Sequence, residues 1–263
     1  TVPFVSKATG VQLAKAAVMI GLGKSIAELK AEGYLPKNMD GASLPQNTAI
    51  AVKAAVLPFS RFRTPEGVVV DSLLSPEMRS TGEVMGLDTL YDTAFAKAQA
   101  GAGSPLPTEG KVFVSVANHD KRNVIIYAKM LEQLGFEIVS TGGTADVLRR
   151  NGVNSTVASK FAEANGQHSI VDMVRNGEID LILNTPAGGA ARSDGYEIRA
   201  AAVSVGCPVM TTISEFAAAV QAITALREHS WGIISLQEHN EYLHSASPGE
   251  QEDSNQVREG ELS

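Results

Sequence analysis

The sequence contains very little cysteine. Cys207 is the single cysteine among 263 residues, so no disulfide can form within the chain. A lone thiol suits a reducing compartment, and we therefore expect a cytoplasmic protein. Because Cys207 lies in the apolar run VSVGCPVM, we expect a buried structural thiol rather than a nucleophile. No apolar run approaches the roughly 18 residues that a membrane-spanning helix needs, so no membrane partner is expected.

Positive charge is also scarce. The chain has 22 Lys and Arg against 29 Asp and Glu, which gives a net charge of −7. This balance argues against a nucleic-acid partner, although it does not exclude a small basic pocket. The chain begins at Thr1, and no charged segment precedes an apolar core there, so a signal peptide is not expected. We expect the sequence to be part of a longer protein.

Residues 1–104 lack a regular strand–helix repeat. Apolar residues recur at helical spacing over 10–33, with Gly33 as the exit, and again over 89–101. Residues 49–59 resemble a strand, and 36–48 a polar loop. Two prolines and several glycines lie within 101–110, and we place a linker at 105–110.

From Lys111 onward, strands and helices alternate. The strands are near-continuous apolar runs, which is typical of a parallel sheet covered on both faces. We therefore predict a Rossmann-like α/β domain over 111–240, followed by an acidic, disordered tail over 241–263. Asp120 is the expected N-cap of the first helix and Gly135 its exit. The predicted strands are 111–117, 136–141, 154–159, 179–185, 208–212 and 231–238, and the predicted helices are 120–135, 144–152, 168–177, 194–206 and 214–229.

Polar residues that can hold a phosphate follow these strands. Ligands of open α/β sheets bind beyond the carboxyl ends of the strands. Glycines allow a close approach of the backbone, a helix N-terminus offers free N–H groups, and hydroxyls and lysines add further donors. The segments at the strand ends are His119–Lys121, Thr141–Thr144 (the sequence TGGT), Lys160, Asn184–Thr185 and Thr211–Thr212.

Each of these residues also has a purely structural interpretation. Lys121 and Lys160 could simply be solvated, and Asn184–Thr185 could only form a turn. His119 is expected to be exposed rather than catalytic. Arg192, Asp194 and Arg199 are expected to be charges on a helix surface, although one of them could line the rim of the site. His229, His239 and His244 show no metal-ligand spacing. The segment GLGKS, residues 21–25, resembles the end of a phosphate-binding P-loop, but it lies within a helical pattern and lacks the preceding strand.

Several longer stretches resemble one family. VPFVSKATGVQLAK (2–15), VLPFSRF (56–62) and SPEMRSTGEVMG (75–86) resemble the end of the second ATP-grasp half of the carbamoyl-phosphate synthase large-subunit family. The series SVANHDKRNV, GFEIVSTGGT and ILNTPAG resembles the methylglyoxal-synthase-like regulatory domain that follows it. The resemblance covers residues 1 to about 238 and assigns 1–104 to the ATP-grasp half and 111–240 to the regulatory domain.

The resemblance implies a part of a larger ligase. The family makes carbamoyl phosphate from bicarbonate, glutamine-derived ammonia and two ATP, for pyrimidine and arginine synthesis. It uses Mg²⁺ or Mn²⁺, receives ammonia from a small glutaminase subunit, and forms oligomers. In the family the metal-binding residues lie just before the segment that begins at Thr1. This chain is therefore expected to need the amino-terminal remainder of the subunit, and to be inactive and without bound cofactor or metal alone.

The resemblance also implies an effector site. The regulatory domain of the family binds nucleotides such as UMP or IMP. Family members that respond to ornithine carry a glutamate where Ala54 stands here, which argues against ornithine control. The stretch Pro186–Gly189 also departs from the family pattern, so the nucleoside side of the pocket is expected to differ. The residues that correspond to the phosphate site are Lys121, Thr141, Gly143, Thr144, Lys160, Asn184 and Thr185.

Two alternatives stay open at this point. A methylglyoxal synthase has the same fold, and it needs a carboxylate base beside the substrate phosphate. Glu163 or Asp172 could be proposed for that role, but neither lies in the motif of those enzymes. A free-standing nucleotide sensor is the second alternative. Residues 1–104 argue against it, because they resemble a portion of another domain.

Overall fold

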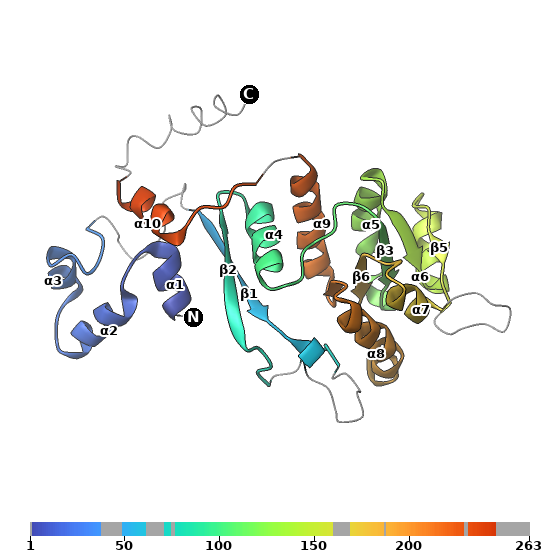
Figure 1. Cartoon of the computed structure of the whole chain (residues 1–263), viewed down its shortest axis with the longest axis horizontal. Coiled ribbons are helices and arrows are strands. Elements are labelled where there is room, and N and C mark those ends of the chain that lie inside the picture. Colours follow the sequence, from blue (N-terminus) through green and yellow to red (C-terminus); the bar gives the residue numbers. More distant parts are fainter. Residues whose placement is uncertain are drawn as a thin grey trace. The chain divides into compact units, whose positions relative to one another are not determined.

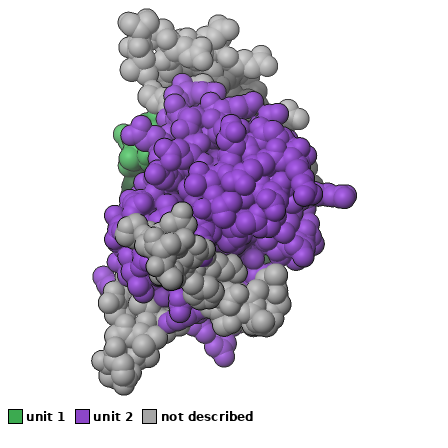
Figure 2. Space-filling view, turned by 90° about the vertical axis from the view of Figure 1, so that its right-hand side faces the viewer, with its two compact units in different colours: residues 1–51, 87–91, 231–263 green, residues 52–86, 92–230 purple. Residues whose placement is uncertain are grey.

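The structure is a computed structural model that describes residues 2–37, 49–61, 71–74, 77–159, 169–186, 188–228 and 231–245. The chain divides into two compact units, which are coloured separately in Figure 2. Unit 1 comprises residues 1–51, 87–91 and 231–263, and unit 2 comprises 52–86 and 92–230. None of the helices among the described residues is long and apolar enough to cross a membrane.

Unit 2 is built on a five-stranded parallel sheet (Figure 1). The strand order is β5–β4–β3–β6–β7, and each neighbouring pair of strands is parallel. The register aligns the carboxyl ends of the central strands: Val114 of β3 lies opposite Ser140 of β4, and Ser115 lies opposite Asn184 of β6. The strands are β3 (Lys111–Ser115), β4 (Glu137–Ser140), β5 (Thr156–Val157), β6 (Leu181–Asn184) and β7 (Val209–Met210).

Apolar side chains cover both faces of this sheet. Alternate residues of β3 point to opposite faces, with Val112 and Val114 in one core cluster and Phe113 in the other. The predicted α/β fold with a parallel sheet is therefore confirmed. The first cluster includes residues of α4 (Tyr91–Gly101), α5 (Val124–Gln133), α6 (Gly142–Arg150) and α9 (Ile213–Glu228), and the second includes residues of α7 (Ile170–Arg175) and α8 (Gly188–Val205).

Two predicted helix starts differ from the structure by four residues or more. The residues around Asp120 form a short 3₁₀ turn, η2 (Asn118–Asp120), and α5 begins only at Val124. The prediction of Asp120 as N-cap is therefore wrong, because its own N–H donates to the carbonyl of Ala117 within that turn. The exit at Gly135 is confirmed by its φ of +87°. Helix α8 begins at Gly188, six residues before the predicted start at 194.

Residues that precede β3 in the sequence contribute side chains to the hydrophobic core of the sheet. Phe95 and Ala96 of α4 and Leu106 beyond it belong to the cluster that covers the first face. Strand β2 (Gly82–Asp88) approaches α4 closely at Gly86, which belongs to unit 2. A Cβ at Gly86 would lie only 1.9 Å from the carbonyl oxygen of Ala94 in α4. Helix α4 therefore packs as part of unit 2, and Leu106 is anchored within the segment predicted as a linker.

A second, two-stranded sheet pairs β1 (Ile50–Val56) with β2. The strand predicted at 49–59 is confirmed as β1, whereas β2 was not predicted. A 3₁₀ turn, η1 (Phe59–Arg61), follows β1 and contacts α8. Residues 71–74 have no regular structure. Most of the predicted loop 36–48 lies outside the described residues.

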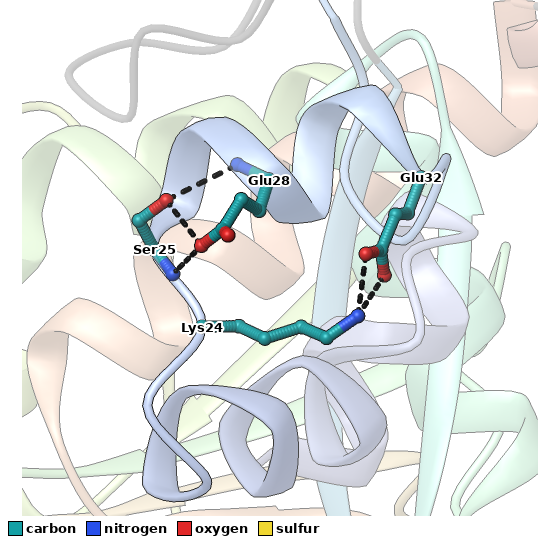
Figure 3. Close-up of polar contacts among 4 residues, drawn as sticks. All are labelled: Lys24, Ser25, Glu28 and Glu32. Atoms are coloured by element: carbon teal, nitrogen blue, oxygen red, sulfur yellow. Dashed lines mark hydrogen bonds and ion pairs between the residues drawn. The ribbon is translucent and has the colours of Figure 1, made fainter.

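Unit 1 consists of short helices. The single helical pattern predicted over 10–33 is divided into α2 (Leu13–Gly21) and α3 (Ile26–Ala31). Ser25 caps α3 in a capping box with Glu28, and Lys24 pairs with Glu32 (Figure 3). Both residues that made GLGKS resemble a P-loop are therefore used in a turn between helices, which agrees with rejecting that motif. Helix α1 (Val2–Thr9) precedes them.

The strand predicted at 231–238 is absent. Residues 231–235 have no regular structure, and α10 (Leu236–Ser245) follows. Ser235 Oγ accepts from the N–H of Glu238 (3.1 Å), and the Glu238 carboxylate accepts from the N–H of Ser235 (2.7 Å), so a capping box starts a helix here. Helix α10 extends five residues into the segment predicted to be a disordered tail. The tail beyond Ser245 lies outside the described residues.

Candidate functional site

The order of the strands marks one end of the sheet as a site for ligands. From β3 the chain runs outward through β4 to β5, and it then returns to the other side of β3 to form β6 and β7. The direction of strand addition thus reverses between β3 and β6. In open α/β sheets, ligands bind beyond the carboxyl ends of the strands at such a switch point. Here Ser115 ends β3 and lies opposite Asn184, which ends β6.

A set of hydroxyl groups lies at this end of the sheet. Thr141 Oγ1 is 3.4 Å from Ser115 Oγ and also 3.4 Å from Thr144 Oγ1. The N–H of Val116 donates to Thr144 Oγ1 at 3.5 Å. These contacts are long, so none of the hydroxyls is held by a strong hydrogen bond inside the protein. They bring the ends of β3 and β4 together and leave donor capacity for a ligand.

The other side of the switch point is joined by shorter bonds. The N–H of Ala117 donates to Thr185 Oγ1 at 2.8 Å, and the N–H of Thr185 donates to the carbonyl of Ser115 at 3.1 Å. Asn184 and Thr185 are buried, with 7% and 8% of their surface exposed. These bonds connect the segments that follow the carboxyl ends of β3 and β6.

The glycine pair lies in the first turn of α6. The helix begins at Gly142, two residues before the predicted start at Thr144. Its N-cap Thr141 makes no side-chain capping bond, in contrast to Ser25 on α3 and Ser169 on α7. The first N–H groups of a helix have no partner within the helix, and they carry its positive dipole end. The N-terminus of α6 is therefore available to an anion.

A lysine ammonium lies beside this turn. Lys121 Nζ is 3.0 Å from the point that a Cβ on Gly143 would occupy. A side chain larger than hydrogen at position 143 would therefore crowd the ammonium. Lys121 itself follows η2, so the 3₁₀ turn places it at the carboxyl end of β3. The positive charge, the threonine hydroxyls and the helix N-terminus meet at one place.

A buried arginine supports Asn184. Arg199 on α8 is fully buried, and its Nη1 donates to Asn184 Oδ1 at 2.9 Å. Its Nε and Nη2 donate to the two carboxylate oxygens of Asp71, each at 2.7 Å. The expectation that Arg199 is a surface charge is therefore wrong. A charged residue within the apolar helix sequence EIRAAAV was the available signal, whereas Asp71 gave none.

The pKa of Asp71 reflects this ion pair. Burial acts to raise the pKa of the Asp71 carboxyl, but hydrogen bonds from Arg199 and from the N–H of Leu73 outweigh it and lower the pKa below 3.8. The carboxyl is therefore ionised at neutral pH. The buried Arg199 guanidinium thus has an ionised carboxylate as its partner.

The other residues that the sequence analysis considered are not part of this cluster or lie outside the described residues. Lys160, Glu163 and His229 lie outside the described residues, and the side chains of Arg192 and Asp194 are not described. His119 has a side chain that is 77% exposed, which agrees with the expectation for it. Thr211 and Thr212 cap α9 through reciprocal bonds of 3.2 Å with Glu215. Burial raises the pKa of Glu215, although the Thr211 N–H acts in the opposite direction.

Asp172 is used structurally. Its Oδ2 accepts hydrogen bonds from the N–H (3.1 Å) and the hydroxyl (2.7 Å) of Ser169, which completes a capping box at the start of α7. A carboxylate with these bonds is held as a helix cap, which does not fit the role of a catalytic base. This weighs against Asp172 in a methylglyoxal synthase reaction.

The surroundings of Cys207 suppress ionisation of its thiol. Burial, together with the charge of Asp180, raises the pKa of the Cys207 thiol to about 12. The thiol is therefore protonated at neutral pH, which fits a structural cysteine, although Cys207 is partly exposed and not buried as predicted. Across the described residues, no group of three or more His, Cys, Asp or Glu could hold a metal ion.

Comparison with known proteins gives a class and then a family. Residues 123–211 match the MGS-like domain family. Together with the parallel sheet and its switch point, this match defines unit 2 as an MGS-like α/β domain with its neighbouring elements. The whole chain is 66% identical over 245 residues to the carbamoyl phosphate synthase large chain of Kocuria rhizophila, covering 92% of this chain. The chain belongs to the carbamoyl phosphate synthase large-chain family.

Other relatives of the same name agree. The large chain of Pseudarthrobacter chlorophenolicus is 66% identical over 243 residues (91% of this chain), and that of Streptomyces griseus is 56% identical over 249 residues (94% of this chain). The chain spans only 22–23% of the length of these relatives. The family and the regulatory-domain fold expected from the sequence are thus confirmed, whereas the ligand roles of the site residues stay predictions.

Proposed function

We propose that this chain is the carboxyl-terminal part of a carbamoyl phosphate synthase large subunit, and that its MGS-like domain binds a nucleoside monophosphate effector of the UMP or IMP class. The phosphate would lie at the carboxyl ends of β3, β4 and β6. Lys121, Thr141, Thr144 and the N-terminus of α6 at Gly143 would hold one side, and Asn184 and Thr185 the other. Lys160 is included on the sequence alone.

The main support for this proposal is that the Lys121 ammonium lies beside the N-terminus of α6. A phosphate dianion prefers a site that combines backbone N–H groups, hydroxyl donors and a fixed positive charge. Lys121 Nζ lies at Gly143, the hydroxyls of Thr141 and Thr144 lie within 3.4 Å of each other, and no side chain caps the helix. Each feature alone is common, whereas their combination at a switch point favours an anion.

The activity of the complete enzyme is also a proposal for this chain. The curated relatives are named carbamoyl phosphate synthase, which indicates an ATP-dependent ligase. We propose that carbamoyl phosphate formation, with glutamine-derived ammonia, ATP and Mg²⁺ or Mn²⁺, belongs to the complete subunit. Its partners would be the amino-terminal remainder, the small glutaminase subunit and further copies in an oligomer. A single cysteine, which allows no disulfide within the chain, suits a reducing cytoplasm.

Calorimetry on the 263-residue chain tests the effector site. UMP or IMP should bind, and uridine or inosine should bind far more weakly. Lys121→Ala removes a charge-assisted bond worth about 1.5–3 kcal/mol, or roughly 10- to 150-fold in affinity. Thr144→Val removes one hydroxyl and should cost about 1 kcal/mol. Lys129→Ala, an exposed lysine on α5, is the matched control and should bind as the parent does.

Two results would contradict the proposal. If neither nucleotide binds the parent chain, or if Lys121→Ala binds both as tightly as the parent, the residues TGGT form only a turn. Methylglyoxal production from dihydroxyacetone phosphate would instead favour the lyase alternative. Asp172→Ala should not affect any such activity if Asp172 serves only as a cap.

A further inference from the structure

We infer that Arg199 is a positioning residue of the proposed effector site: it turns the amide of Asn184 so that its NH₂ group faces the ligand, and Asp71 holds Arg199 in that role. This inference rests on the proposed nucleotide site and adds two residues to it. Neither would touch the ligand. They would act through the orientation of one side chain at the carboxyl end of β6.

The orientation of Asn184 follows from the chemistry of its partner. An arginine guanidinium has only hydrogen-bond donors, so the amide atom that faces it must be the carbonyl oxygen. Arg199 Nη1 lies 2.9 Å from Asn184 Oδ1. The Nδ2 group makes no hydrogen bond to the described residues. A fixed Oδ1 therefore leaves Nδ2 as a donor for an anion.

The position of Arg199 is in turn fixed by Asp71. The two bonds of 2.7 Å form a bidentate pair, which restrains the plane of the guanidinium. The Asp71 carboxylate also accepts from the N–H of Leu73 at 3.1 Å, which restrains the carboxylate itself. The Arg199 side chain is fully buried, so loss of Asp71 would remove an ionic partner from a charge inside the protein. The three residues form a relay of fixed geometry.

Gly195 makes room for this relay. It lies one helical turn before Arg199 on α8, on the same face of the helix. A Cβ at this position would lie 2.3 Å from Arg199 Nη1 and 2.7 Å from Asn184 Oδ1. Any larger residue would therefore push the two groups apart. The sequence thus supplies a glycine where the Arg199–Asn184 bond requires empty space.

The relay also reaches along the chain. Asp71 lies 128 residues before Arg199, in the part that the sequence assigns to the ATP-grasp half. A ligand that needs Nδ2 in its outward position would favour the conformation in which Arg199 bonds to both partners. By thermodynamic reciprocity, ligand binding would then strengthen the Asp71 contact to the same extent. Effector binding would in this way be coupled to the segment at Asp71.

The test uses variants of the 263-residue chain and two measurements. The first is the side-chain amide signal of Asn184 in a ¹H–¹⁵N correlation spectrum, which Asn184→Ala identifies by its loss. The second is the affinity for UMP and for uridine by calorimetry. Asp71→Asn removes the charge and keeps the size, whereas Arg199→Lys keeps the charge and loses the planar fork. Arg175→Lys, an exposed arginine on α7, is the matched control.

The expected results separate positioning from general stability. Asp71→Asn and Arg199→Lys should shift the Asn184 signal, and Arg199→Lys should weaken UMP binding roughly ten-fold or more while uridine binding changes little. Gly195→Ala should behave in the same way. Asn184→Asp keeps an oxygen for Arg199 but turns a donor into a negative charge. It should therefore abolish UMP binding while the fold persists, which a merely structural role would not produce.

Three outcomes would overturn the inference. One is an Asn184 signal that is unchanged in both Asp71→Asn and Arg199→Lys, whether or not these variants bind UMP. Another is a parent chain that binds UMP while Arg199→Lys and Asn184→Asp bind it equally well. The third is a parent chain that binds no nucleotide. This last result removes the proposed function first, and it is distinguished because the parent itself fails. If Arg199→Lys does not fold, Asp71→Asn, whose site is partly exposed, decides the matter.

Discussion

The two compact units differ in how much apolar surface they bury. In unit 2 the central strand residues of the sheet are fully buried on both faces, and helices supply the rest of two continuous clusters. In unit 1 the buried apolar residues of the helices are few, and Val18, Leu22 and Ile26 are 59–76% exposed. The difference follows from geometry, because a sheet offers two faces to a core, whereas a helix of six to nine residues offers one narrow stripe.

This contrast predicts unequal stability. Helices shorter than about 12–15 residues are marginal on their own and depend on packing for their stability. Unit 1 has little of that packing in this chain, and its exposed apolar side chains suit the proposed contact with the remainder of the subunit. We therefore expect unit 1 to unfold before unit 2. Trp231 is the only tryptophan of the chain and lies in unit 1, so its fluorescence reports on that unit.

The largest effect is expected from a change in the core of unit 2. Phe113 is fully buried at the centre of β3, and Phe113→Ala should lower the free energy of unfolding of unit 2 by about 3–5 kcal/mol. Urea titration followed by far-UV circular dichroism measures this change. The transition seen by Trp231 fluorescence should move little and should lie at lower urea already in the parent. Coincident transitions by both probes in the parent would contradict the comparison.

A smaller effect is expected from two equivalent helix caps, one in each unit. Ser169→Ala removes the cap of α7 in unit 2, and Ser25→Ala removes the cap of α3 in unit 1, each at a cost of about 0.5–2 kcal/mol. Ser169→Ala should shift the dichroism transition and Ser25→Ala the fluorescence transition. Ser204→Ala, within α8, is the control and should cost nothing, because alanine is the better helix former. A shift of both transitions by either cap variant would mean that the units unfold together.

The sequence predicts unit 2 better than unit 1 for the same physical reason. Strands buried on both faces must be continuous apolar runs, so LILN and the similar runs show in the sequence itself. The run WGIISLQE resembled them, yet it has no partner strand, and Ser235 with Glu238 starts a helix there. Because this segment pairs with no strand, the capping box of Ser235 and Glu238 determines its structure, and a helix forms. The Ser-x-x-Glu pattern was the signal that the prediction overlooked.

The site was partly predictable. The carboxyl ends of parallel strands meet at one edge, so the residues after β3, β4 and β6 had to lie near each other once the strands were identified. The link from Arg199 to Asp71 could not be predicted, because it joins residues 128 positions apart and residues 71–74 have no regular structure. Sequence periodicity carries no information on such a contact. Only the three-dimensional structure shows that a charged helix residue points inward.

The smallest effect is expected from His239 in unit 1. This residue on α10 is 5% exposed, and no described group forms a hydrogen bond with its Nε2. Burial lowers the pKa of His239 below 6.5, although a hydrogen bond with the backbone of Ala8 acts in the opposite direction. The folded state thus prefers the neutral ring. The resulting stabilisation is fully present above pH 6.5 and is lost as the pH falls through the lower pKa of the folded state.

The Trp231 fluorescence transition should therefore move to lower urea between pH 7.5 and pH 5, by less than Ser25→Ala moves it. The range from pH 7.5 to pH 5 begins above the ordinary histidine pKa of 6.5 and extends below it, because the fold lowers the pKa of His239. His239→Gln cannot gain a proton, so its transition should keep less of this pH dependence than that of the parent. His119→Gln, a change at an exposed histidine of unit 2, should leave the dependence as it is. An equal pH dependence in the parent and in His239→Gln would show that burial of the ring does not contribute to holding α10 against α1, which are in contact within unit 1.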